Sequence, residues 1–272
     1  MTSYQFFMVE DFPKFTKARR EISNQVQMTI TGAPETIHTK ITPVPATHHK
    51  DGFERLRVET GIKYEVFGYT YVPFNGKLER KDFSEYVKTV EFPAYVNRDA
   101  NTLILKASDK VAKGFLKNVE QGNTGIKPLN AEIDFDKVHK QNPTYIAAWF
   151  KGISPNVRSL GMSGFKIEDT EQFRQCLALG VISALAMEYP YEGVQNGFVL
   201  GKRASVSLYK NYTKSHINES SLIIKIFDEI VSESWSLRKT GKKDLSVPTI
   251  VDPEFHDFDP KFLDHKPEDG GE

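Results

Sequence analysis

Apolar and polar residues alternate along two stretches in the first half of the chain, as expected of β-strands with one buried face. The first stretch, residues 53–73, reads FERLRVETGIKYEVFGYTYVP and is rich in aromatic and β-branched residues. We predict a hairpin here that turns at Thr60-Gly61. A second hairpin is predicted over residues 94–106, and it leads directly into a helix.

Shorter strand patterns follow in the second half of the chain. Residues 157–167 are predicted to be extended and residues 170–179 to be helical. Three apolar runs then follow one another, separated by turn signals at Gly193 and Gly201, and they read VISALAMEY, NGFVLG and RASVSLYKN. This order predicts a meander of strands that delivers the chain into a helix.

Two segments have the three- and four-residue apolar spacing of amphipathic helices. One begins near Asn218 and has its apolar face at Leu222, Ile223, Ile226, Phe227, Ile230, Val231 and Trp235. The other follows Ser108, and its apolar side is made by Val111, Ala112, Phe115, Leu116 and Val119. A third helix, interrupted near Pro143, is predicted over residues 136–150.

The predicted elements define an α+β fold of antiparallel hairpins and meanders with helices packed on one face, because strands come in runs and do not alternate regularly with helices. Each half ends in a strand that enters a helix, which leaves open an organisation in two related sub-domains. We therefore divide the chain into an N-terminal α+β domain, residues 1–125, a C-terminal α+β domain, residues 126–251, and a tail, residues 252–272.

Charge is distributed unevenly, although the chain as a whole has 36 basic and 36 acidic residues. The tail contains eight acidic residues but only Lys261 and Lys266 as bases, so residues 1–251 hold 34 basic and 28 acidic residues. We expect the acidic tail to be disordered. The basic excess of the remainder favours an anionic partner.

A stripe of lysines is the main functional candidate. At 100° per residue, Lys110, Lys113 and Lys117 fall within about 60° of one another on the helix surface. Lys106, at the end of the preceding strand, extends this charge, while Ser108 suits the N-cap position. The stripe has two interpretations, the solvated side of a surface helix and a ridge that contacts phosphates.

Motifs for nucleotide binding and nucleophilic catalysis are absent from the sequence. Gly201-Lys202 is followed by Arg203, where a phosphate-binding loop would need Ser or Thr, and no Gly-x-Ser-x-Gly occurs. The sequences Asp134-Phe135-Asp136 and Glu79-Arg80-Lys81 could serve a metal-dependent nuclease, but such patterns are frequent by chance. We expect no cofactor and no metal site.

The function predicted from these observations is non-catalytic nucleic-acid binding, to DNA or RNA, through the basic helix face. Lys202 and Arg203, in a tight turn, would add phosphate contacts, and Tyr209 and Tyr212 would add stacking. An alternative is a protein-interaction subunit of a larger complex, since mixed charge and many aromatic residues also suit a protein partner. An enzyme of another kind, such as a metal-dependent nuclease, is the third alternative.

The expected compartment is the cytoplasm. The single cysteine, Cys176, excludes an internal disulfide framework and fits a reducing environment. No window approaches 18 apolar residues, so we expect no membrane partner.

Overall fold

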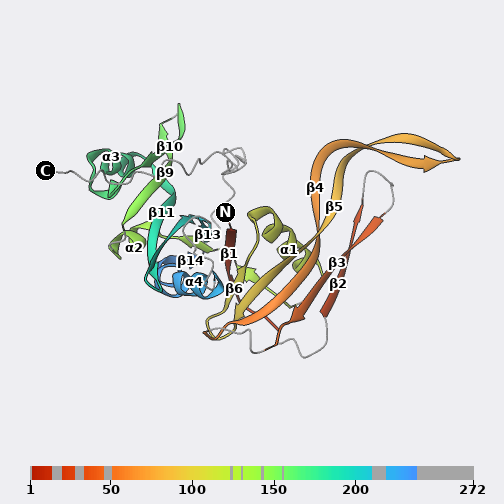
Figure 1. Cartoon of the computed structure of the whole chain (residues 1–272), viewed down its shortest axis with the longest axis horizontal. Coiled ribbons are helices and arrows are strands. Elements are labelled where there is room, and N and C mark those ends of the chain that lie inside the picture. The colour runs from red at the N-terminus through yellow and green to blue at the C-terminus, as the bar shows by residue number, and fades with distance from the viewer. Residues whose placement is uncertain are drawn as a thin grey trace. The chain divides into compact units, whose positions relative to one another are not determined.

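A 12-stranded antiparallel sheet forms the centre of the fold in the computed structural model (Figure 1). The structure describes residues 2–13, 20–27, 34–45, 51–122, 125–129, 131–141, 144–154, 156–209 and 219–237. The predicted acidic tail, residues 252–272, and Tyr212 lie outside these residues. No helix in the described ranges is long and apolar enough to cross a membrane.

The strands of the first half are β1 (Thr2–Val9), β2 (Arg20–Gln27), β3 (Pro34–Pro43), β4 (Glu54–Phe74), β5 (Lys77–Asn97), β6 (Thr102–Leu105) and β7 (Pro128–Leu129). Those that follow are β8 (Ala131–Ile133), β9 (Tyr145–Ser154), β10 (Val157–Ser163), β11 (Val181–Tyr191), β12 (Val194–Gly201), β13 (Ser205–Leu208) and β14 (Trp235–Leu237). The helices are α1 (Asp109–Gln121), α2 (Phe135–Lys140), the short η2 (Ile167–Asp169), α3 (Glu171–Leu179) and α4 (Glu219–Ile226), which continues through the π-helical turn η3 (Phe227–Val231) into α5 (Ser232–Ser234).

The order of strands in the large sheet is β10-β9-β11-β12-β13-β1-β6-β5-β4-β3-β2, with β7 paired to β1. A separate two-stranded sheet joins β14 to β8. The predicted α+β class, with antiparallel hairpins and meanders, is confirmed. β1 pairs with β6 on one side and with β13 on the other, so the first and second halves of the chain share one sheet. The division at residue 125 stays a prediction.

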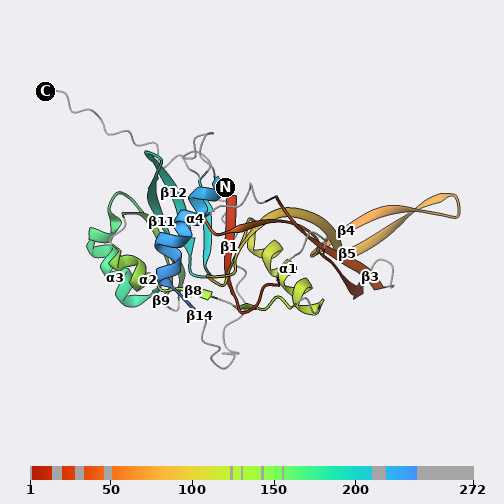
Figure 2. The same ribbon diagram turned by 90° about the horizontal axis from the view of Figure 1, so that it is seen from below.

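Opposite faces of the central strands carry different cores, because successive side chains of a strand point to opposite sides. In β6, Leu103 and Leu105 belong to the core that includes α1, whereas Ile104 between them belongs to the core that includes α4. We call these sides the α1 face and the α4 face. Figure 2 shows the two helices against separate parts of the sheet. Helix α1 packs on one face of the sheet and helix α4 packs on the other.

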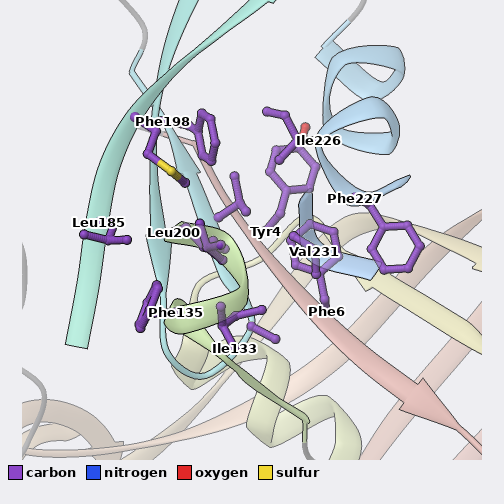
Figure 3. Close-up of a cluster of buried hydrophobic side chains, with 14 of the residues drawn as sticks. Tyr4, Phe6, Ile133, Phe135, Leu185, Phe198, Leu200, Ile226, Phe227 and Val231 are labelled. Atoms are coloured by element: carbon purple, nitrogen blue, oxygen red, sulfur yellow. The ribbon is translucent and has the colours of Figure 1, made fainter. Parts of the chain in front are cut away.

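The core on the α4 face joins the first described strand to the last described helix (Figure 3). Phe6 of β1 stacks on Phe227 with ring centroids 5.6 Å apart, and both side chains are almost completely buried. Ile226 and Val231 lie in the same cluster. The apolar spacing predicted for the helix near Asn218 is therefore the spacing that this core uses.

The predicted turn at Thr60-Gly61 is wrong, because both residues lie inside the 21-residue strand β4. Gly61 is needed for close packing, since a Cβ there would lie 2.9 Å from Ile37 Cγ2. The chain instead reverses at Asn75 (φ 49°) and Gly76 (φ 74°), whose left-handed conformations fit the tight turn that best matches strand twist. β4 and β5 consequently form one long hairpin.

The predicted helix over residues 136–150 is also wrong in its second part. α2 ends at Lys140, and Tyr145–Ser154 form β9, which pairs with β10 and β11. Its buried side chains include Tyr145, Ala147 and Phe150. The helix therefore ends before Pro143, which lies outside the described residues, as expected since proline does not continue a helical hydrogen-bond ladder.

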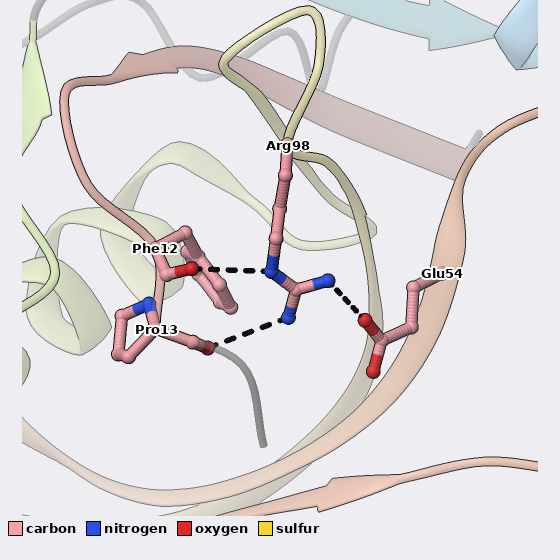
Figure 4. Close-up of polar contacts among 4 residues, drawn as sticks. All are labelled: Phe12, Pro13, Glu54 and Arg98. Atoms are coloured by element: carbon pink, nitrogen blue, oxygen red, sulfur yellow. Dashed lines mark hydrogen bonds and ion pairs between the residues drawn. The ribbon is translucent and has the colours of Figure 1, made fainter. Parts of the chain in front are cut away.

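Arg98, in the turn between β5 and β6, holds the segment that follows β1 (Figure 4). Its Nε–H donates to Phe12 O at 3.1 Å and its Nη2–H to Pro13 O at 3.3 Å, while Nη1–H donates to the Glu54 carboxylate. The planar guanidinium satisfies three acceptors at once, which an ammonium group cannot do with the same geometry. The base of the long hairpin is thus tied to the end of β1.

Candidate nucleic-acid interface

α1 lies close against β4 because Gly114 has no side chain at the contact. A Cβ on Gly114 would lie 2.7 Å from Ile62 Cδ1. One turn later, the buried Asn118 donates through Nδ2 to Thr60 Oγ1 at 3.0 Å and to Gly61 O at 2.9 Å. Because Asn118 meets residue 60 and Gly114 meets residue 62, the beginning of α1 points toward the distal part of the hairpin.

Lys110 makes the contact between the beginning of α1 and the hairpin. Its Nζ lies 4.2 Å from the centroid of the Tyr64 ring, within the range of a cation–π interaction. Tyr64 in turn stacks on Tyr86, its partner on β5, with centroids 5.3 Å apart. A cation and two aromatic rings therefore stand together where the helix meets the strands.

Lys113 and Lys117 continue the exposed side of α1. Lys113 Nζ lies 2.5 Å from Asp109 Oδ2, one helical turn away. Both partners are about half exposed, and such pairs contribute little free energy, so Lys113 is available to another anion. Within the described parts of the chain, Lys110 and Lys117 form no ion pair with a carboxylate. The three-lysine side predicted for this helix is therefore present on its surface.

Lys106 points away from this group. Its Nζ lies 3.0 Å from Glu219 Oε2 at the beginning of α4 and 5.8 Å from the centroid of the Tyr4 ring. Tyr4 belongs to the core on the α4 face, so Lys106 does not extend the α1 ridge as the sequence suggested. Burial first, and then the Glu219 carboxylate, raise the pKa of the Tyr4 hydroxyl above its usual range. The phenol accordingly remains neutral.

Lys202 and Arg203 occupy the turn between β12 and β13, as predicted. Lys202 N donates to Ser183 O at 2.9 Å, and Lys202 O accepts from Ile133 N at 2.8 Å. Ile133 belongs to the core on the α4 face. The backbone of the turn is therefore fixed to the part of the fold that carries α4, and these two residues are not brought together with the lysines of α1.

Two other expectations need correction. Tyr209 is buried, with 7% of its surface exposed, and cannot present its ring to a base. Ser108 occupies the N-cap position of α1, but its side chain makes no capping hydrogen bond. Neither residue contributes the interaction for which the sequence pattern suggested it.

Asp134 and Asp136 do not form a pair of strand carboxylates. Asp134 is the N-cap of α2, and its side chain accepts from the backbone N–H groups of Asp136 and Lys137. In the described ranges, no group of three or more His, Cys, Asp or Glu residues is placed to hold a metal ion. The Asp134 side chain has a structural role that its spacing from Asp136 did not indicate.

The long hairpin carries side chains that the sequence reasoning missed. Beyond the Tyr64–Tyr86 pair, β4 and β5 pair only with each other among the described strands, and we call residues 65–84 the arm (Figure 1). Tyr69 and Tyr71 of the arm are each 58% exposed. The Arg80 guanidinium carbon lies 4.4 Å from the centroid of the Tyr69 ring. The Asn75-Gly76 pair, which is typical of a two-residue hairpin turn, is the sequence signal that would have revealed this hairpin.

No known protein-family model matches the chain, and no curated protein sequence matches it.

Proposed function

We propose that the protein binds nucleic acid without catalysing a reaction on it, and that Lys110, Lys113 and Lys117 of α1 contact the phosphates. One observation carries the proposal: the three lysines share one exposed side of a helix whose beginning adjoins Tyr64 of β4. Lysine binds phosphate as a flexible point charge. Contacts of this kind attract the backbone of a nucleic acid and carry no information about its base sequence.

A salt titration tests the proposal, because every phosphate that a lysine neutralises releases condensed counterions. Three such contacts predict that the logarithm of the association constant falls with the logarithm of salt concentration with a slope of about −2.7 for duplex DNA. The double substitution Lys110→Gln and Lys117→Gln removes two contacts and should make the slope shallower by about 1.8. Fluorescence anisotropy of a labelled duplex measures both slopes.

α2 offers a matched control. Lys137 and Lys140 are exposed lysines of a helix that belongs to the α4 face, and replacing both by glutamine changes the net charge by the same amount. This control should leave the slope as in the unsubstituted protein. Absence of binding at low salt to both the duplex and a single strand of the same length, or equal effects of the two double substitutions, would overturn the assignment to α1.

A protein-interaction subunit is the second candidate, and the outer strand β10 favours it. β10 pairs only with β9 among the described strands, and almost all of its side chains are exposed. Apolar residues are exposed in this region, and they are Val157, Leu160, Phe165, Leu177, Leu179 and Val181. An exposed edge beside apolar side chains is suited to pairing with an extended segment of another protein.

Self-association through this edge can be measured directly. If a second copy occupies it, light scattering should give a mass above the 30.9 kDa of one chain, and Leu160→Lys should restore the monomer. A mass that stays at that of one chain over the whole concentration range would exclude a second copy as the occupant.

A further inference from the structure

A β-bulge decides which side chains of the arm share the α1 face. Between Glu65 and Gly68, β4 advances three residues while β5 advances two, so β4 contains one extra residue. Tyr64 is opposite Tyr86 before the bulge, and Tyr69 and Tyr71 are opposite Asp82 and Arg80 after it. Residues 86, 82 and 80 of β5 are separated by even numbers and share one side of the strand. Their partners on β4 therefore share that side too.

The α1 face of the arm and its base consequently carries a row of rings and cations. Tyr64, Tyr86, Tyr69 and Tyr71 extend over about 20 Å at ~3.3 Å per residue. Lys110 lies over the first ring and Arg80 over the third, and Tyr69 and Tyr71 pack edge to face at 6.0 Å. The row is continuous with the lysines of α1.

The charges of the two faces of the hairpin differ. On the opposite face, Lys63, Lys77 and Lys81 are balanced by Glu65, Glu79 and Glu85. On the α1 face, the hairpin's own Arg80 and Lys88 outnumber its single carboxylate, Asp82, which lies 3.0 Å from Arg80 Nε. Helix α1 adds Lys110 and the Lys113–Asp109 ion pair. Positive charge and tyrosine rings are therefore concentrated on the same face.

We propose that this face holds single-stranded nucleic acid, with bases stacked on Tyr69, Tyr71 and the Arg80 guanidinium and with phosphates on the lysines of α1. The inference rests on the proposed function and adds the kind of nucleic acid to it. Aromatic rings and guanidinium planes stack on any base, which gives affinity with little dependence on sequence. The Lys110 contact places the base of the row beside the phosphate-binding side of α1.

The occupant is a single strand because stacking requires access to the flat surface of a base. In a duplex, neighbouring base pairs cover those surfaces, so the tyrosines of the arm would add little to its binding. A protein segment would not benefit from the excess of cations unless it were acidic. The arrangement of rings and charges favours unpaired nucleotides.

Paired measurements on single-stranded and duplex probes test the inference. A labelled oligothymidine, an oligouridine of equal length and a mixed-sequence duplex are titrated by fluorescence anisotropy. Tyr69→Ala combined with Tyr71→Ala should weaken binding of both single strands by roughly 100-fold, about tenfold per ring, and should leave duplex affinity within about twofold. Tyr69→Phe with Tyr71→Phe keeps the rings and should restore the affinity for single strands.

Phe74→Ala supplies the matched control. Phe74 is 54% exposed on the same arm, but it is an odd number of residues from Tyr71 and lies on the opposite face. Its removal should leave affinity for both single strands unchanged. Because all three aromatic residues are largely exposed, circular dichroism and thermal melting should show a folded protein in every variant.

The outcomes separate this inference from the function on which it rests. If the double alanine variant binds single strands as the unsubstituted protein does, while the Lys110→Gln and Lys117→Gln variant loses affinity for every probe, the stacking role is overturned and the phosphate role stands. If no probe binds at low salt, the proposed function falls. If Phe74→Ala weakens binding as much as loss of the tyrosines, the assignment to the α1 face is overturned.

Discussion

Gly114 of α1 lies directly over Ile62 of β4, so closely that a Cβ at position 114 would come within 2.7 Å of Ile62 Cδ1. Glycine in a helix interior costs about 1 kcal/mol relative to alanine. At this position the missing side chain lets the helix approach the strand, and the approach brings Lys110 to the ring of Tyr64.

A double-mutant cycle at this contact should show coupling. Gly114→Ala gains helix propensity but overpacks the contact, and we expect a net loss of about 1 kcal/mol in the free energy of unfolding. Ile62→Val should cost about 1 kcal/mol alone. The double variant should lose about 1 kcal/mol less than the sum, because valine lacks the clashing Cδ1. Urea denaturation measures all four proteins, and additive losses would contradict the packing described.

Lys106 should matter for stability and not for nucleic-acid binding. Lys106→Met leaves the partly buried Glu219 carboxylate without its cation, and we expect the free energy of unfolding to fall by about 1 kcal/mol. The salt dependence of binding should stay as in the unsubstituted protein, because this lysine points to the α4 face. A shallower slope for this variant would show that Lys106 contacts phosphate after all.

Gly76→Ala should loosen the arm locally. Gly76 has a φ of +74°, which alanine adopts only at a cost of about 1 kcal/mol, and no neighbouring atom would obstruct the new methyl group. Hydrogen exchange should accelerate in the arm but not in β6 or α1, since the arm beyond the Tyr64–Tyr86 pair has no third described strand to support it. Asn75→Gly is the control, since glycine adopts positive φ readily. Uniform acceleration throughout the sheet would contradict local loosening.

Removing residues 252–272 should tighten nucleic-acid binding if the acidic tail competes for the basic surface. At low salt we expect roughly a fivefold gain in affinity, which should disappear as screening increases. A tail of equal length with its carboxylates changed to amides is the control, and it should behave like the deletion. Equal affinities of all three proteins would show that the tail does not interact with the site.

Local patterns predicted much of the secondary structure but not the partners of the strands. The apolar spacing from Leu222 to Val231 predicts the helix formed by α4 and η3, and the alternation before Asn101 predicts the β5–β6 hairpin. These signals depend only on neighbouring residues. By contrast, the sequence around Gly61 suggests a turn, whereas the structure needs a glycine there to leave room for Ile37. Ile37 lies on a separate strand, so the local pattern does not reveal this requirement.

The candidate site shows the same division. The spacing of Lys110, Lys113 and Lys117 fixes their common side of α1, and the structure agrees. The direction of Lys106 depends on strand alternation and on Glu219, which lies 113 residues away in the chain. Likewise, Tyr64 and Tyr71 share a face only because of an irregularity in strand pairing. Counting residues alone would assign the two tyrosines to opposite sides.

The bulge in β4 between Glu65 and Gly68 therefore determines which residues of the outer part of β4 lie on the α1 face. Removing the extra residue of the bulge would leave Tyr64 and Tyr69 four positions apart in a regular strand, so the tyrosines would keep the α1 face through simple alternation. Retaining it in a strand without the bulge would instead present Thr70 beside α1 and place Tyr69 and Tyr71 on the other side, so the local irregularity itself aligns the phenols with the lysines.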